Sequence, residues 1–290
     1  MMKTHAHVAR DDTRRRRSTS TSAVLTLASL ALGAAAGCGG SDTSPQGGRT
    51  APGAERSTKT AALETGADLM QDGSPVGQIS MYLVGFHPSK DDASLQMESH
   101  HYCDQVNEDF AQCVLYDGNG DAARMHGIEY IISERLYATL AKEERAYWHP
   151  HNYEILSGTL RMPGLPDVAE KEAMQGKVNS YGKTWHVWMT GVHGRPADSL
   201  PLGPAHLAWS FNHDGEAYPE MVADRDRRMG LSSSDARADR AELAPLAKPQ
   251  GGVNAVAELF PNASGAPAGV EDSGISGTEP VPIVTLRPPR

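Results

Sequence analysis

Two histidines separated by one residue, with a carboxylate close behind, form the pattern most able to do chemistry. They are His149, His151 and Glu154 in the segment WHPHNYE. In an extended segment the two imidazoles lie on one side, where both reach a single ion, and the carboxylate adds an oxygen. Such a ligand set suits Zn, Fe or Mn. The alternative is a loop at the end of a helix, in which His149 contacts the last carbonyl groups.

Three further histidines are candidates for the same cluster. His100 and His101 are adjacent, and His186 lies between an aromatic and an aliphatic residue. We expect His149 and His151 to share a polar pocket with His100 and His101, with no cofactor. Convergence of the rings at coordination distances would instead favour a metal ion. The alternative for His186 is a hydrogen-bonded core histidine.

Two of the three cysteines, Cys103 and Cys113, lie ten residues apart. In an exported protein they are expected to form a disulfide, which would stabilise the fold by about 2–3 kcal/mol. Two buried thiols are one alternative. Thiolate ligation with His100 or His101 is another, although the spacing lacks the CxxC pattern of zinc sites.

Residues 1–37 have the pattern of an export signal. The arginines of 14–17 precede an apolar stretch, 23–36, that is too short for a comfortable membrane span. The following AAGC resembles the lipobox of bacterial lipoproteins, which implies acylation of Cys38 and a membrane anchor in the cell envelope. The absence of aspartate after Cys38 favours the outer membrane. The alternative is ordinary cleavage near Ala36, with Cys38 as a free thiol.

Charge and composition then separate a folded domain from its flanks. The 290-residue chain has a net charge of −9, and the part after residue 37 is more acidic still, which argues against a nucleic-acid partner. Of the 17 aromatic residues, 16 lie between Tyr82 and Tyr218. We therefore expect a flexible tether over 38–64, a domain over 65–247 with its core at 76–220, and a disordered Pro/Gly-rich tail over 248–290.

Hydrophobic periodicity predicts an α+β domain with a mostly antiparallel sheet of about six strands and two or three helices, flanked by disordered tails. In the strand at 127–133, Ile128, Tyr130 and Ile132 share one side. The charged stretch at 224–228 is expected to be a solvated helix face. The other expected strands are 78–86, 112–116, 153–162, 184–190 and 205–213, and the expected helices are 134–147, 167–178 and 232–243.

Part of the histidine pattern resembles the first motif of cupins. His149, His151, Glu154 and Gly158 follow that motif with one residue fewer before the glutamate, and PLGPAH with Asn212 is similar to the second motif. The resemblance implies a metal-dependent enzyme or sensor that uses a histidine cluster.

Longer phrases resemble a different family. In chain order they are HHYCDQVNEDFAQCVLYDG, GIEYIISERLY, EERAYWHPHNYEILSG, PGLPDVAEK, NSYGKTWHVW, LPLGPAHLAWSFNHDG and RDRRMG. From about Thr65 to Leu246 the chain is similar to oil body-associated proteins. The resemblance implies a non-enzymatic protein with affinity for lipid surfaces. We therefore expect a membrane-anchored lipoprotein that contacts a lipid surface or envelope partners, with the cupin-like metal protein as the alternative.

Overall fold

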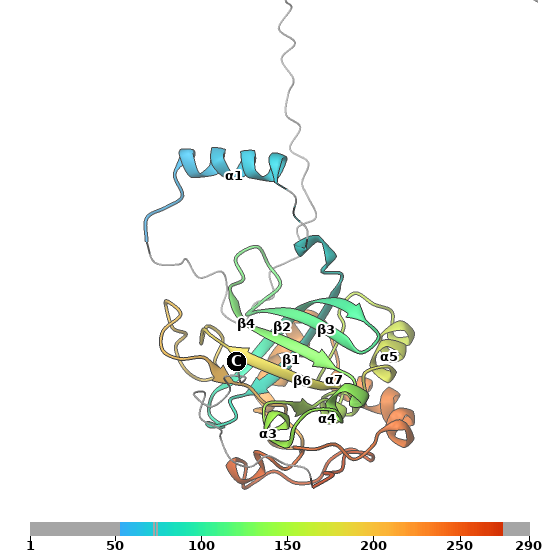
Figure 1. Cartoon of the computed structure of the whole chain (residues 1–290). Coiled ribbons are helices and arrows are strands. Elements are labelled where there is room, and N and C mark those ends of the chain that lie inside the picture. The colour runs from blue at the N-terminus through green and yellow to red at the C-terminus, as the bar shows by residue number, and fades with distance from the viewer. Residues whose placement is uncertain (1–52, 72, 74, 275–290) are drawn as a thin grey trace, which may run out of the picture. The chain divides into compact units, whose positions relative to one another are not determined.

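The computed structural model of the chain describes residues 53–71, 73 and 75–274, which include one antiparallel sheet of seven strands (Figure 1). The order is β1-β2-β3-β4-β6-β5, and β7 also pairs with β6. This confirms the predicted α+β class. The expected signal, Cys38 and the first part of the tether lie outside the described residues. The last part of the expected flexible tether, 58–64, is helical instead. The strands are β1 (Met81–Pro88), β2 (Gln96–Asn107), β3 (Phe110–Tyr116), β4 (Met125–Ile132), β5 (His149–Pro150), β6 (Tyr181–His186) and β7 (His206–Leu207).

In strand β4 the side shared by Ile128, Tyr130 and Ile132 is not the main buried side, and of these three residues only Ile132 is buried. Ile128 and Tyr130 are partly exposed, whereas Glu129 and Ile131 are buried. An irregularity in the pairing of β3 with β4 leaves His126 without a directly paired residue and lets its side chain be buried as well. The sequence prediction failed because a polar cluster, not an aliphatic one, fills the inner face at this point.

Short helices connect and flank the strands, and the described residues contain seven where two or three were expected. None of these helices is long and apolar enough to cross a membrane. Serine side chains cap the first turns of α1, α2 and α7. The helices are α1 (Thr58–Met70), α2 (Glu134–Tyr137), α3 (Lys142–Arg145), α4 (Asn152–Leu156), α5 (Asp167–Gln175), α6 (Pro219–Met229) and α7 (Ser233–Asp239). Three 3₁₀ segments are η1 (Val76–Gln78), η2 (Arg240–Leu246) and η3 (Ala257–Leu259).

Several expected elements differ from the observed ones. The expected strand at 153–162 begins instead as α4, because the amide of Asn152 donates to a distant side chain, Gln250, and caps this short helix. The expected helix at 134–147 is two helices, α2 and α3, since the guanidinium of Arg145 binds the carbonyls between them. Of the expected strand at 205–213, β7 pairs with β6, and the next residue, Ala208, forms one isolated bridge with Ser89. Strand β2 was not expected, and α6 was expected only as a helix face at 224–228.

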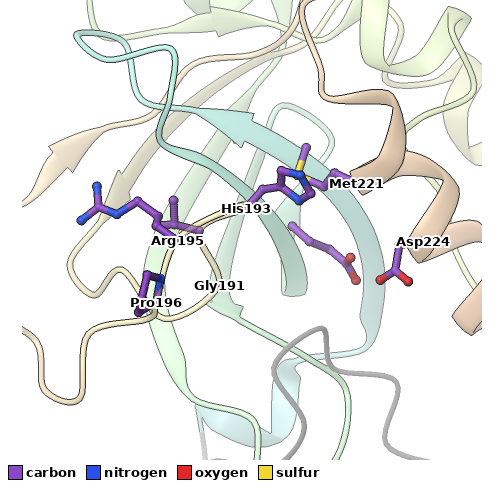
Figure 2. Close-up of a pocket in the computed structure, with 9 residues that line it drawn as sticks. Gly191, His193, Arg195, Pro196, Met221 and Asp224 are labelled. Carbon is purple, nitrogen blue, oxygen red and sulfur yellow. The ribbon is translucent and has the colours of Figure 1, made fainter.

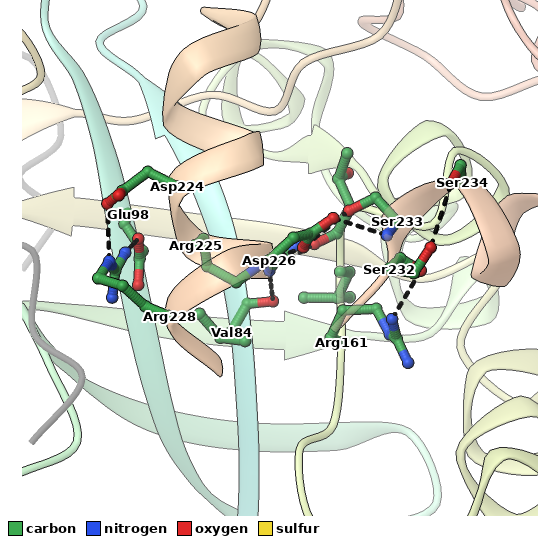
Figure 3. Close-up of polar contacts among 12 residues, drawn as sticks. Val84, Glu98, Arg161, Asp224, Arg225, Asp226, Arg228, Ser232, Ser233 and Ser234 are labelled. Carbon is green, nitrogen blue, oxygen red and sulfur yellow. Dashed lines mark hydrogen bonds and ion pairs between the residues drawn. The ribbon is translucent and has the colours of Figure 1, made fainter. Parts of the chain in front are cut away.

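The charged stretch in α6 is a solvated face only in part, because Arg227 is exposed but Arg225 is completely buried. Its guanidinium donates to the carbonyls of Val84 and Thr159 and to the hydroxyl of Ser233, as Figure 3 shows in part. Arg228 forms ion pairs with Glu98 and Asp224 in the same view. These arginines tie α6 to β1 and β2.

The first part of the tail expected to be disordered over 248–290 is folded onto the domain. Residues 248–274 are ordered against the domain, and Gln250, Val253 and Val256 are buried. The glycines and prolines of this segment form tight turns; Gly252, for example, has a φ of +89°. Composition alone could not distinguish such a segment from a disordered one.

Candidate metal centre

The carboxylate of Glu129 on β4 lies among four buried histidines. Its oxygens are 2.9 Å from Nε2 of His101, 3.2 Å from Nε2 of His151, 3.6 Å from Nε2 of His149 and 3.8 Å from Nε2 of His87. All five side chains are at most 5% exposed. Strands β1, β2 and β5 and the start of α4 thus direct four imidazoles at one carboxylate.

Three of these donor atoms have the spacing of a tetrahedral coordination shell. Nε2 of His149 and Nε2 of His151 are 3.3 Å apart, and Oε1 of Glu129 is 3.6 and 3.2 Å from them. Ligand atoms that lie about 2.0–2.1 Å from one ion at tetrahedral angles are about 3.3–3.4 Å apart. Glu154 offers a carboxylate within 4.8 Å of the two histidine donors. His87, Glu129 and His149 form a second, overlapping group.

In His101 and His151, a hydrogen bond at Nδ1 leaves Nε2 as the nitrogen that can coordinate a metal ion. The hydroxyl of Ser180 donates to a carbonyl and so accepts from Nδ1 of His151, at 2.8 Å. Nδ1 of His101 donates to the carbonyl of Ser99, at 3.1 Å. In the neutral ring Nε2 is then a lone pair aimed at the carboxylate of Glu129. Two acceptors at this distance require a proton or a metal ion between them.

The pKa values of the buried groups suit a metal ion. Burial lowers the pKa of His149 to about 4 and that of His87 well below its usual value. Burial acts to raise the pKa of Glu129, but where a proton lies between its oxygens and the Nε2 atoms, hydrogen bonds from the histidines outweigh burial and hold the pKa well below normal. Burial and the charge of Glu129 raise the pKa of Glu154 well above normal. An ionised carboxylate among neutral imidazoles is the state that binds a metal.

The donor atoms of Glu129, His149 and His151 have room to converge because residue 182 is a glycine. A Cβ at Gly182 would lie 2.2 Å from Oε1 of Glu129, 2.5 Å from Nε2 of His149 and 2.6 Å from Nε2 of His151. A neighbouring cavity of about 20 Å³ is lined in part by His87, His101, Glu129, His151 and Glu154. That volume holds one water molecule or one ion.

The other predicted residues lie around this centre in different ways. His100 is on the opposite face of β2, where Nε2 contacts Glu98 and Nδ1 accepts from the hydroxyl of Tyr82. His186 lies beside the cluster; its Nδ1 is 3.1 Å from Nδ1 of His126. The structure therefore brings together His149, His151, Glu154 and His101, leaves His100 apart and places His186 at the edge.

Sequence reasoning missed two members of the cluster, His87 and Glu129. Glu129 was not considered, because its neighbours Ile128 and Tyr130 alternate as a core pattern would. The available signal was a single acidic residue between two aliphatic or aromatic positions of a strand. The second cupin-like motif supplies no ligand: His206 is partly exposed near Asp91.

The cysteines lie close to the centre in the sheet. A disulfide joins Cys103 of β2 and Cys113 of β3, which are directly paired. Cys113 is also the direct partner of Glu129 on β4. The bond therefore links β2, which carries His101, to β3, the strand that pairs with β4 at Glu129.

A larger hollow is lined by none of the cluster residues. Its volume is about 380 Å³, and the loop at 191–196 forms one side of it, with Met221 and Asp224 of α6 on another (Figure 2). Glu98 also lines it, but His100 and Arg228 already bind that carboxylate. The histidine centre remains the site with convergent donor atoms.

Comparison with known proteins gives consistent relatives. Residues 73–244 match a family described as "Protein of unknown function (DUF1264)". "Oil body-associated protein 1B" of Arabidopsis thaliana is 36% identical over 201 residues, covering 69% of this chain and 82% of that protein. "Oil body-associated protein 1A" of Zea mays is 36% identical over 192 residues, covering 66% and 79%. No solved structure matches the chain significantly.

Proposed function

The chain belongs to the oil body-associated protein family, and from the geometry of its buried centre we propose that it binds one divalent transition-metal ion, Zn, Fe or Mn. Glu129, His149 and His151 are the proposed ligands, and Glu154, His87 or His101 completes the shell. The observation that carries this proposal is the convergence of Nε2 of His149 and Nε2 of His151, which are 3.3 Å apart, on Oε1 of Glu129 at 3.6 and 3.2 Å.

The chemistry of the centre supports a closed site. Structural metal sites are fully ligated by protein, whereas catalytic sites keep an open position for water or substrate. The ligands are buried, and the neighbouring cavity of about 20 Å³ has no room for a substrate. The ion is therefore proposed to hold β4, β5 and α4 together, or to report metal availability, and not to turn over a large substrate.

Metal analysis of the purified chain without residues 1–37 tests this proposal. We expect about one Zn, Fe or Mn ion per chain after loading and dialysis. Glu129→Gln should reduce that content strongly, because it removes the only ionised carboxylate of the centre. The exposed Glu143 of α3 gives the matched control, Glu143→Gln, which should retain the metal. Trace metal in the loaded parent protein would contradict the proposal.

A second candidate function, contact with a lipid surface, is favoured by the outer face of the sheet. Val76 is 70% exposed, and Ile128 and Tyr130 on β4 are 38% and 39% exposed. Ile128 is paired with Val114, which is paired with Tyr102, so apolar and aromatic residues cross neighbouring strands. Relatives named oil body-associated proteins agree with a lipid partner.

In this second proposal the protein is a lipoprotein acylated at Cys38 and anchored in the cell envelope, with the outer membrane favoured. The segment between Cys38 and α1 is the proposed tether through which the acidic domain reaches the lipid surface. Radioactive palmitate should label the chain but not Cys38→Ala, and label that persists in Cys38→Ala would refute the anchor. Ile128→Asp with Tyr130→Asp should weaken flotation with phospholipid vesicles, whereas the matched exposed substitution Thr139→Asp should not.

A further inference from the structure

The C-terminal segment Lys248–Ser273, which we call the strap, lies beyond the part of the chain that matches the family. It nevertheless reaches the two segments that carry His151 and Gly182. Gln250 makes the central contact and is only 1% exposed. The strap is drawn in orange to red in Figure 1.

Gln250 joins those two segments by two hydrogen bonds. Its Oε1 accepts from the amide of Asn152, at 2.9 Å, and its Nε2 donates to the carbonyl of Ser180, at 3.0 Å. The same carbonyl accepts from the amide of His151, and the hydroxyl of Ser180 accepts from Nδ1 of that ring. Gln250 thus fixes the residue that orients His151.

The next two strap residues contact the surroundings of the centre as well. The amide of Gly251 donates to the hydroxyl of Tyr181, the neighbour of Gly182. The carbonyl of Gly252 accepts from the indole of Trp209, whose ring lies 6.0 Å from the ring of His149. A Cβ at Gly252 would lie 2.8 Å from that indole, so glycine allows the strap to lie this close.

Hydrogen bonds between the two ends of the strap hold it in this position. The amide of Gln250 donates to the carbonyl of Glu271, and the amide of Ser273 donates to the carbonyl of Gln250. Asp272 accepts from the amide of Asn254. The one isolated pairing of the strap, Gln250 opposite Asp272, lies within the strap itself, so the strap can open without unpairing the sheet. Opening also exposes Val253 and Val256 and breaks the bonds of Ser264 and Gly265 to Asp214.

We propose that Gln250 is a positioning residue and that the strap controls exchange of the metal ion, an inference that rests on the proposed metal centre. The ligands are buried, so an ion leaves only if the segment at 149–152 or the segment at 180–182 moves. Gln250 bonds to both segments. Lifting the strap releases them, and docking the strap restores the ligand geometry.

The test compares two buried glutamines with the same kind of contacts. Gln250→Met removes both side-chain hydrogen bonds at nearly constant volume. Gln96→Met is the control, since Gln96 is also 1% exposed, accepts from the amide of Tyr218 and donates to the carbonyl of Glu216. Transfer of Zn²⁺ from the loaded protein to excess chelator should be about tenfold faster in Gln250→Met, given the usual strength of two neutral hydrogen bonds. It should be unchanged in Gln96→Met. Gln250→Glu keeps the acceptor for Asn152 and should fall between.

A second measurement does not involve metal. Amide hydrogen exchange in the metal-free protein should be faster at 149–152 and 180–182 in Gln250→Met than in the parent, and unchanged there in Gln96→Met. Equal Zn²⁺ release from Gln250→Met and the parent, or equal acceleration in both variants, overturns the strap proposal. A parent protein that takes up no Zn²⁺ overturns the metal centre and with it the control of exchange. The exchange experiment then still shows whether Gln250 clamps the two segments.

Discussion

Substitution of Gly182 by alanine is the most direct test of the geometry around Glu129. The added methyl carbon would lie 2.2–2.6 Å from three donor atoms, on Glu129, His149 and His151. Carbon rarely approaches nitrogen or oxygen closer than about 3.0–3.4 Å, so each donor must retreat by roughly 0.5–1 Å. Metal–ligand distances tolerate about ±0.2 Å, and the three donors therefore cannot keep one ion.

We expect Gly182→Ala to weaken Zn²⁺ binding by at least about 100-fold, which corresponds to about 2.7 kcal/mol. Isothermal titration of the metal-free protein measures this affinity, and the absorption spectrum of the Co²⁺ form reports the ligand geometry. Gly176→Ala is the matched control, because a Cβ at Gly176 meets its nearest atom at 3.6 Å. The reasoning would be refuted if Gly182→Ala bound Zn²⁺ as tightly as Gly176→Ala.

Three further predictions concern the framework. Titration of the denatured, unreduced protein should find no free thiol from Cys103 and Cys113, and reduction should lower stability to urea by about 2–3 kcal/mol; two titratable thiols would reject the bond. Arg225→Ala should destabilise the domain by about 3 kcal/mol or more, since it leaves buried partners unpaired. Arg227→Ala, on the exposed side of the same helix, should change the stability to urea by less than about 0.5 kcal/mol. Similar losses of stability in the two variants would contradict the burial argument. Burial lowers the pKa of Lys90 to about 8 from 10.5, so the unfolded chain binds more protons than the folded one between these values, and stability should rise with pH across pH 8–10.5. That rise should be absent in Lys90→Met, and urea unfolding of both proteins at pH 7.5 and 10 measures it.

The class of fold was predictable from the sequence because β1, β3 and β4 carry clear alternation. The face of β4 was not. Alternation gives the period of a strand but not the side that is buried, and here the inner side carries a carboxylate. Strand β2 was missed because its inner positions hold histidine and cysteine, which do not form a recognisable hydrophobic pattern.

Only part of the candidate site could be predicted, because local spacing in the sequence does not show which distant residues meet. His149 and His151 are neighbours in sequence, and their spacing alone predicts a shared direction. His87 and Glu129 enter the cluster only through strand pairing over long sequence distances, which no local pattern encodes. The same holds for Gln250, since a Pro/Gly-rich composition predicts disorder unless its partners are known.

The two proposed functions occupy opposite faces of one sheet, and this separation has a physical consequence. On β4, Glu129 points inward to the imidazoles, whereas Ile128 and Tyr130 point outward. A buried cluster of imidazoles and carboxylates is costly without a cation, because each unpaired polar group loses its hydration. The exposed apolar face is unfavourable in free energy only while it faces water and no partner covers it. Metal binding should therefore stabilise the domain whether or not lipid is present, and lipid contact should leave the affinity for metal unchanged.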